Sequence, residues 1–134
     1  MINIPENTVK WFRSGSSYIC FPPVTNTDYD LVLYVLPENF GPFMDALIAD
    51  GWERGGSRNE QSEWASFKKT EDGVLYNFIV TQSETHYANM YIATAVAKRL
   101  NLLRKHDRVM LFHAIVDGEI PFVLDGSERQ EIPF

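Results

Sequence analysis

Residues 31–36 read Leu31-Val32-Leu33-Tyr34-Val35-Leu36, an unbroken apolar run in which β-branched side chains recur. A run of this length without alternating polar positions predicts a strand that is buried on both faces. A strand of this kind lies inside a sheet that other elements cover. The run therefore places a small, helix-covered sheet at the centre of the fold.

Upstream of this strand, the sequence predicts a short helix and a second, shorter strand. Proline is tolerated in a first helical turn, so residues 5–12 are expected to form a helix that brings Trp11 and Phe12 onto the core. Residues 18–21 are expected to form a strand that ends at two prolines, Pro22 and Pro23.

Downstream, the sequence predicts a helix and then a hairpin. Asn39 can cap a helix over residues 40–50, which ends at Gly51 and turns Phe43, Ala46 and Leu47 to one face. Residues 64–69 and 74–80 are expected to be strands, because they flank Thr70-Glu71-Asp72-Gly73, a turn whose glycine can adopt positive φ.

The remainder of the domain is expected to be helical. Ser83 can cap a long helix, and Val109, Phe112 and Val116 indicate another that ends at Gly118. This order of elements predicts an α/β (α+β) fold, a small mixed sheet with flanking helices. The apolar stripe of the long helix that is expected to face the core consists of Ala88, Ile92, Val96, Leu100 and Leu103.

Length and composition indicate one globular domain. The chain has 134 residues, of which 45% are hydrophobic and 22% charged, as is usual for a single folded domain. Residues 1–118 are expected to form that domain. Residues 119–134 show no clear periodicity, and they could be an edge strand, a docking tail or a partly mobile extension.

Charge and cysteine content exclude several classes of protein. Twelve Lys and Arg against eighteen Asp and Glu give a net charge of −6, which argues against broad binding to nucleic-acid backbone. Cys20 is the single cysteine, so neither an intrachain disulfide nor a cysteine-based zinc cluster can form. With no signal-like N-terminus and no long apolar run, a cytoplasmic protein without a membrane partner is expected.

Two carboxylates at the entrance of the central strand form the strongest chemical signal. Alternate residues of a strand point to one face, so Asp28 and Asp30 can present their carboxylates together. Such a pair, with phosphate and water, is a typical environment for Mg²⁺. The upstream Gly15-Ser16 turn can add backbone N–H groups and a hydroxyl that hold phosphate oxygens. Together these residues predict a metal and phosphate site.

The motif Gly15-Ser16, followed by Asp28-Tyr29-Asp30 and the apolar strand, resembles the nucleotidyltransferase superfamily of the polymerase-β-like fold. Three blocks, residues 15–23 with Thr27-Asp28, residues 77–81 and residues 93–102, look more narrowly like short nucleotidyltransferase-like proteins of tailed bacteriophages. This narrower resemblance extends from about residue 14 to residue 119. It implies a minimal nucleotidyltransferase-like fold. It also implies a phage-encoded protein that is located in the host cytoplasm.

The resemblance implies a function. A member of this family transfers a nucleoside monophosphate from a nucleoside triphosphate to a hydroxyl, and tRNA or a protein is a possible acceptor. Two Mg²⁺ ions, or Mn²⁺ in their place, would clamp the triphosphate. By position, Asp28 and Asp30 would be catalytic metal ligands, and Gly15 and Ser16 would hold the phosphates. The position of a third family carboxylate falls on Asn77.

Asn77 departs from the family pattern, because an amide cannot act as a base. The chain could recruit Glu84 or Glu63 instead. Alternatively, it could be a catalytically weakened nucleotidyltransferase fold that acts by binding a nucleotide or a host protein, for example in counter-defence. The missing carboxylate favours this second hypothesis, whereas the Asp28 and Asp30 pair favours the enzyme.

A basic cluster could serve the same site. Five of the twelve Lys and Arg residues lie between positions 98 and 108, and they could steer a triphosphate or a nucleic-acid end towards the carboxylates. Lys98 is the residue expected to bind phosphate. The cluster could equally be a solvated corner between two helices.

Overall fold

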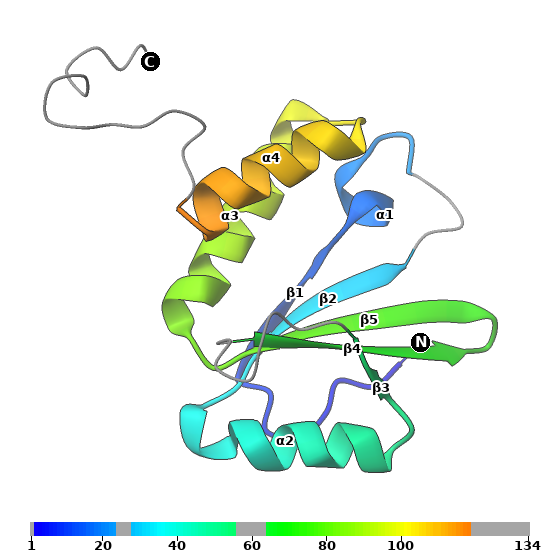
Figure 1. Cartoon of the computed structure of the whole chain (residues 1–134). Coiled ribbons are helices and arrows are strands. Elements are labelled where there is room, and N and C mark those ends of the chain that lie inside the picture. Colours follow the sequence, from blue (N-terminus) through cyan, green and yellow to red (C-terminus); the bar gives the residue numbers. More distant parts are fainter. Residues whose placement is uncertain (1, 24–27, 56–63, 119–134) are drawn as a thin grey trace, which may run out of the picture.

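The computed structural model describes residues 2–23, 28–55 and 64–118. Within these ranges the chain forms a five-stranded mixed sheet in the order β1-β2-β5-β4-β3, with helices on both faces (Figure 1). This architecture confirms the expected fold class. The strands are β1 Lys10–Ser14, β2 Tyr29–Tyr34, β3 Glu53–Arg54, β4 Trp64–Glu71 and β5 Val74–Thr81, and the helices are α1 Ser16–Ile19, α2 Pro37–Ala49, α3 Glu84–Leu100 and α4 Lys105–Val116.

The central strand is confirmed as β2. It pairs antiparallel with β1 and parallel with β5, and its residues Leu31, Val32 and Leu33 have no exposed surface. The strand begins two residues before the apolar run, so Asp30 is itself a strand residue. The backbone of the sheet therefore fixes the position of this carboxylate.

One face of the sheet packs against α2 (Figure 1). Phe78 of β5 stacks on Trp52, with ring centroids 4.1 Å apart, and Phe43 and Leu47 of α2 complete this core. The helix begins at Pro37, because proline suits a first helical turn. The expected burial of Ala46 is wrong, since its side chain is exposed.

The other face packs against α3, whose start is confirmed. The backbone N–H of His86 donates to Ser83 Oγ at 3.1 Å, so Ser83 caps the helix. The expected core stripe is wrong: Ile92 and Leu100 are 48% and 62% exposed. Ala88, the first residue of this stripe, is already exposed, so the stripe lies beside the face of the helix that meets the sheet. The buried residues of α3 are Tyr87, Met90, Ala93, Thr94 and Ala97.

The helix expected over residues 5–12 is wrong, because residues 10–14 form the strand β1. Long-range pairing decides the conformation here: Lys10 lies opposite Tyr34 of β2, and Ser14 opposite Asp30. Phe12 reaches the core and contacts Tyr87 edge to face. On the other side of this edge strand, Trp11 is 44% exposed instead of buried.

The strand expected over residues 18–21 is also wrong. Residues 16–19 form the single helical turn α1. The backbone N–H groups of Tyr18 and Ile19 donate to the carbonyl oxygen of Gly15 at 3.0 and 2.9 Å. These local hydrogen bonds close the turn directly after β1.

The hairpin and the final helix are confirmed. Asp72 and Gly73 both have positive φ, as the tightest hairpin turns require, and Gly118 follows the end of α4 with φ of 67°. Residues 119–134, expected to be an extension, lie outside the described residues. None of the helices in the described ranges is long and apolar enough to cross a membrane.

Candidate functional site

A row of polar residues crosses four strands at one end of the sheet. The strand register places Ser14 opposite Asp30, Asp30 opposite Asn77, and Asn77 opposite Lys68. Directly paired residues point to the same face of a sheet. Ser14 Oγ lies 2.8 Å from Thr94 Oγ1 of α3, so this is the α3 face. The register thus brings Asp30 and Asn77 side by side, on neighbouring strands as the family resemblance implied.

Gly15 brings the backbone directly against this row. Its φ is 81° and its ψ 170°, a combination that is nearly restricted to glycine. A Cβ atom at this position would overlap the carboxylate of Asp30. The absence of a side chain at Gly15 therefore lets the backbone lie directly against the Asp30 carboxylate.

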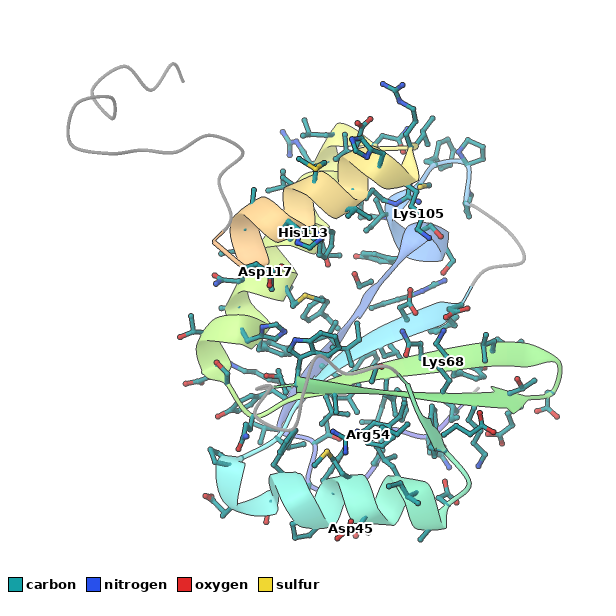
Figure 2. The ribbon with its side chains drawn as sticks, in the orientation of Figure 1. Asp45, Arg54, Lys68, Lys105, His113 and Asp117 are labelled. Carbon is teal, nitrogen blue, oxygen red and sulfur yellow. The ribbon has the colours of Figure 1, made fainter. Side chains whose placement is uncertain are left out.

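A cavity of about 720 Å³ opens beside Gly15 and Asp30. Ser16 and Asp28 also line it, so four of the six predicted site residues share one space. This volume is within the range of small-molecule sites. The helix α4 forms the opposite wall, from which Lys105, Arg108, His113 and Asp117 contribute polar side chains; Figure 2 labels three of these along the helix.

The environment of Asp30 raises its pKa from 3.8 to about 6. Burial is the main cause, and the neighbouring Asp28 carboxylate raises the pKa further. A hydrogen bond from Asn77 and the positive charges of Lys68 and Arg13 act in the opposite direction. Ionised Asp30 is thus held at a free-energy cost that a cation would offset.

Two buried oxygen atoms in this row have no hydrogen-bond partner among the described residues. They are Oδ1 of Asp30 and Oδ1 of Asn77. Buried acceptors normally have a partner, and both of these groups can ligate a hard cation. This observation supports a cation beside the Asp30 and Asn77 pair.

Asp28 already has a positively charged partner. Lys68 Nζ lies 3.2 Å from Asp28 Oδ2, and Ser17 Oγ donates to the backbone carbonyl of Asp28 at 3.3 Å. The sequence analysis missed Lys68. The hairpin turn could have indicated it. A turn at Asp72-Gly73 fixes the strand register, and that register sets Lys68 opposite Asn77.

The donor set fits one divalent cation. Carboxylate oxygens of Asp28 and Asp30 and the amide oxygen of Asn77 are ligands of the type that Mg²⁺ or Mn²⁺ accepts. Lys68 engages one of the two Asp28 oxygens, and the amide adds no charge. No three His, Cys, Asp or Glu side chains gather as a metal cluster in the described part of the chain.

The structure places Lys98 away from this cavity, as it does not line the space. Its Nζ donates to the carbonyl oxygen of Tyr18 at 2.8 Å and lies 4.1 Å from the centre of that ring. The phosphate-binding role of Lys98 therefore lacks structural support. From the same basic cluster, Lys105 and Arg108 line the cavity instead.

Arg108 has a structural role. Its Nη1 donates to the carbonyl oxygens of Leu102 and Leu103 at 2.9 and 2.8 Å, so it ties the start of α4 to the end of α3. Of the two basic residues of the cluster that line the cavity, Lys105 is therefore the better candidate for binding a ligand there.

The two replacement acids suggested by the sequence do not reach the site in the described structure. Glu84 lies 3.4 Å from Lys10 Nζ in an exposed ion pair, as expected for an acid in a first helical turn. Glu63 lies outside the described residues.

Sequence reasoning also missed the imidazoles of the cavity wall. His113 Nδ1 lies 2.9 Å from Asp117 Oδ2, and the His86 ring is stacked against Trp64 at 6.1 Å between centroids. All four residues line the cavity. Only the spacing of His113 and Asp117, one helical turn apart, could have indicated their contact.

No protein-family model matches this chain, and no curated protein matches it. Among solved structures, the chain is similar to the crystal structure of Cid1 poly(U) polymerase. The sequences are 17% identical, the match covers 75% of this chain, and the TM-score is 0.43. This chain spans 31% of the length of that chain.

Proposed function

We propose that the protein binds a nucleoside triphosphate together with a divalent cation and transfers its nucleoside monophosphate to a hydroxyl acceptor. The observation that carries this proposal is the close approach of the Gly15 backbone to the Asp30 carboxylate at a cavity of about 720 Å³. A metal-bound triphosphate can use both kinds of partner: backbone or hydroxyl donors on one side and a cation held by carboxylates on the other.

Each residue of the site has a part in this proposal. Asp28, Asp30 and Asn77 would hold Mg²⁺ or Mn²⁺, and the bound ion would neutralise charge on the phosphates. Ser16, which lines the cavity, would donate its hydroxyl to a phosphate oxygen. Lys105, at the start of α4, would bring a positive charge from the opposite wall (Figure 2).

The acceptor is proposed to be a hydroxyl of tRNA or of a protein. The resemblance to short bacteriophage proteins supports a phage-encoded enzyme that acts on a molecule of the host.

A second function is favoured by Asn77. Its amide stands opposite Asp30, where the family resemblance implies a carboxylate, and an amide cannot accept the proton of an attacking hydroxyl. A catalytically weakened fold that binds a nucleotide, or a host protein, agrees with this substitution. Under this hypothesis nucleotide binding persists and transfer is slow.

A transfer assay separates the two functions. The protein is incubated with each of the four α-labelled nucleoside triphosphates, Mg²⁺ or Mn²⁺, and tRNA or host lysate. The enzyme hypothesis predicts labelled product with the wild-type chain and none with Asp30→Asn. The binding hypothesis predicts little wild-type product and more with Asn77→Asp, because a positioned base contributes roughly 10²- to 10⁴-fold in rate.

The outcomes of this assay have clear readings. Transfer that is vigorous in the wild-type chain and unchanged by Asn77→Asp would show that Asn77 is not the third position. Equal and substantial product from the wild-type chain and from Asp30→Asn would contradict the enzyme hypothesis, because that hypothesis depends on this carboxylate.

A further inference from the structure

Lys68 places a positive charge at the end of the sheet where Asp28 and Asp30 lie. It lies on β4 opposite Asn77, and its ammonium is 3.2 Å from Asp28 Oδ2. The side chain extends from the hairpin formed by β4 and β5 (Figure 2). Four strand positions in a row thus combine two acceptors that lack a hydrogen-bond partner in the described structure with one positive charge, on a lysine side chain that is 48% exposed.

Before a nucleotide binds, the charges at this end of the sheet limit how many metal ions it can hold. Asp28 and Asp30 supply two negative charges, and Asn77 supplies an oxygen without charge. Two divalent cations would bring four positive charges to these two carboxylates. One divalent cation and the Lys68 ammonium bring three, and the ammonium already uses one oxygen of Asp28.

We propose that Lys68 is a fixed counter-ion that takes the place of a second metal ion, so that the site binds a single divalent cation between Asp30 and Asn77. This inference rests on the proposed function, because it concerns the same nucleotide site. It assigns to Lys68 a positioning role. The ammonium pairs with the Asp28 carboxylate, so that this carboxylate does not bind a second divalent cation.

The neighbouring residue Lys69 offers a matched control. It lies on the opposite face of β4, where its Nζ is 3.5 Å from Asp50 Oδ2 and donates to the Asp50 carbonyl oxygen at 2.8 Å. Both lysines therefore pair with an aspartate. Only the Lys68 pair adjoins the oxygens of Asp30 and Asn77 that have no hydrogen-bond partner in the described structure.

The test measures Mn²⁺ binding by calorimetry and by electron paramagnetic resonance, first with Mn²⁺ alone and then with a non-hydrolysable nucleoside triphosphate. The variants are Lys68→Gln, Lys68→Arg and Lys69→Gln, each checked for folding by circular dichroism. Lys68→Arg keeps the positive charge, so it separates the effect of losing the charge from the effect of changing the side chain.

The wild-type chain, Lys68→Arg and Lys69→Gln are expected to bind one Mn²⁺ with equal affinity. Lys68→Gln is expected to bind Mn²⁺ roughly tenfold more tightly, because a like charge near the ion is removed and Asp28 becomes available. With the nucleotide analogue present, Lys68→Gln is expected to take up a second ion.

Three results would overturn this inference. If Lys68→Gln and the wild-type chain bind one Mn²⁺ equally, Lys68 is not a counter-ion, while the proposed nucleotide function still stands. If the wild-type chain binds two ions, the charge argument fails, again without harm to the proposed function. If no variant binds Mn²⁺, the proposed metal-dependent function itself fails and the inference fails with it.

Discussion

The two faces of the sheet use the same strands for different purposes. On the α2 face, Leu31, Phe67 and Phe78 are fully buried and pack as a continuous core. One residue along, on the α3 face, Asp30, Asn77 and Lys68 form a polar row beside a cavity. Because the side chains of a strand alternate, a single sequence can place stability on one face and chemistry on the other.

The α3 face is itself divided along its length. Val32 and Tyr34 of β2 pack against Tyr87 and Met90 of α3, whereas Asp30, two residues before Val32, borders the cavity. The helix covers one end of the strand, and the cavity lies at the carboxylate end. We therefore expect mutations on the α2 face to reduce stability and mutations in the polar row to change binding with little loss of stability.

The largest effect on stability is expected on the α2 face. Phe78→Ala should lower the free energy of unfolding by about 3–5 kcal/mol, the usual result of removing a buried phenylalanine from a packed core. Urea denaturation measures this loss. Ile79→Ala, one residue along on the cavity side, should cost less than half as much, and equal losses would contradict the contrast between the faces.

The next effect concerns Asp30 and has the opposite sign. The pKa of Asp30 is about 6 in the folded chain against 3.8 ordinarily, so the folded state holds this proton more tightly. The stability that it contributes below about pH 4 is lost as the pH rises through about 6.

The side chain of Asn does not titrate, so the variant Asp30→Asn does not lose this stability as the pH rises. The stability of the variant relative to wild type should rise by about 3 kcal/mol between about pH 4 and about pH 7, since one pKa unit is worth about 1.4 kcal/mol. Urea denaturation at several pH values without metal measures this difference. A difference that stays constant with pH would show that Asp30 is not held in the environment described above.

A smaller loss is expected at Gly15. Gly15→Ala should destabilise the protein by about 1–3 kcal/mol, because alanine is strained at this φ and ψ. Its Cβ must also displace the Asp30 carboxylate, so metal binding should weaken at the same time. Gly73→Ala, at a turn where no atom approaches, is the control: it should share the strain but leave metal binding unchanged.

Local signals predicted much of this molecule. The apolar run of β2, the hairpin turn and the Ser83 cap are each encoded within a few residues, and all three are confirmed. For the site, strand alternation placed Asp30 on one face, and the family resemblance pointed to Asn77. Their neighbouring positions in the sheet now give that pair a geometric basis.

What the sequence did not predict depends on contacts between distant segments. Residues 10–14 form a strand because β2 offers them a partner some twenty residues away. The buried face of α3 is chosen by contacts such as that of Thr94 with Ser14, which no periodicity reveals. Likewise, His113 and Asp117 reach the cavity only through the way in which α4 packs.

The most direct test of the central claim is Mg²⁺-dependent binding of a non-hydrolysable nucleoside triphosphate, measured by calorimetry. The wild-type chain should bind the analogue with Mg²⁺ and bind it far more weakly without the ion. The double variant Asp28→Asn/Asp30→Asn should lose at least about 10²-fold in affinity without a lower melting temperature, because the ligands of the cation are gone while the α2 face is intact. Asp50 pairs with Lys69 on the α2 side of the sheet, away from the cavity. The control variant Asp50→Asn should therefore bind the analogue as the wild-type chain does. Undiminished Mg²⁺-dependent binding by the double variant would contradict the claim that this end of the sheet is the nucleotide site.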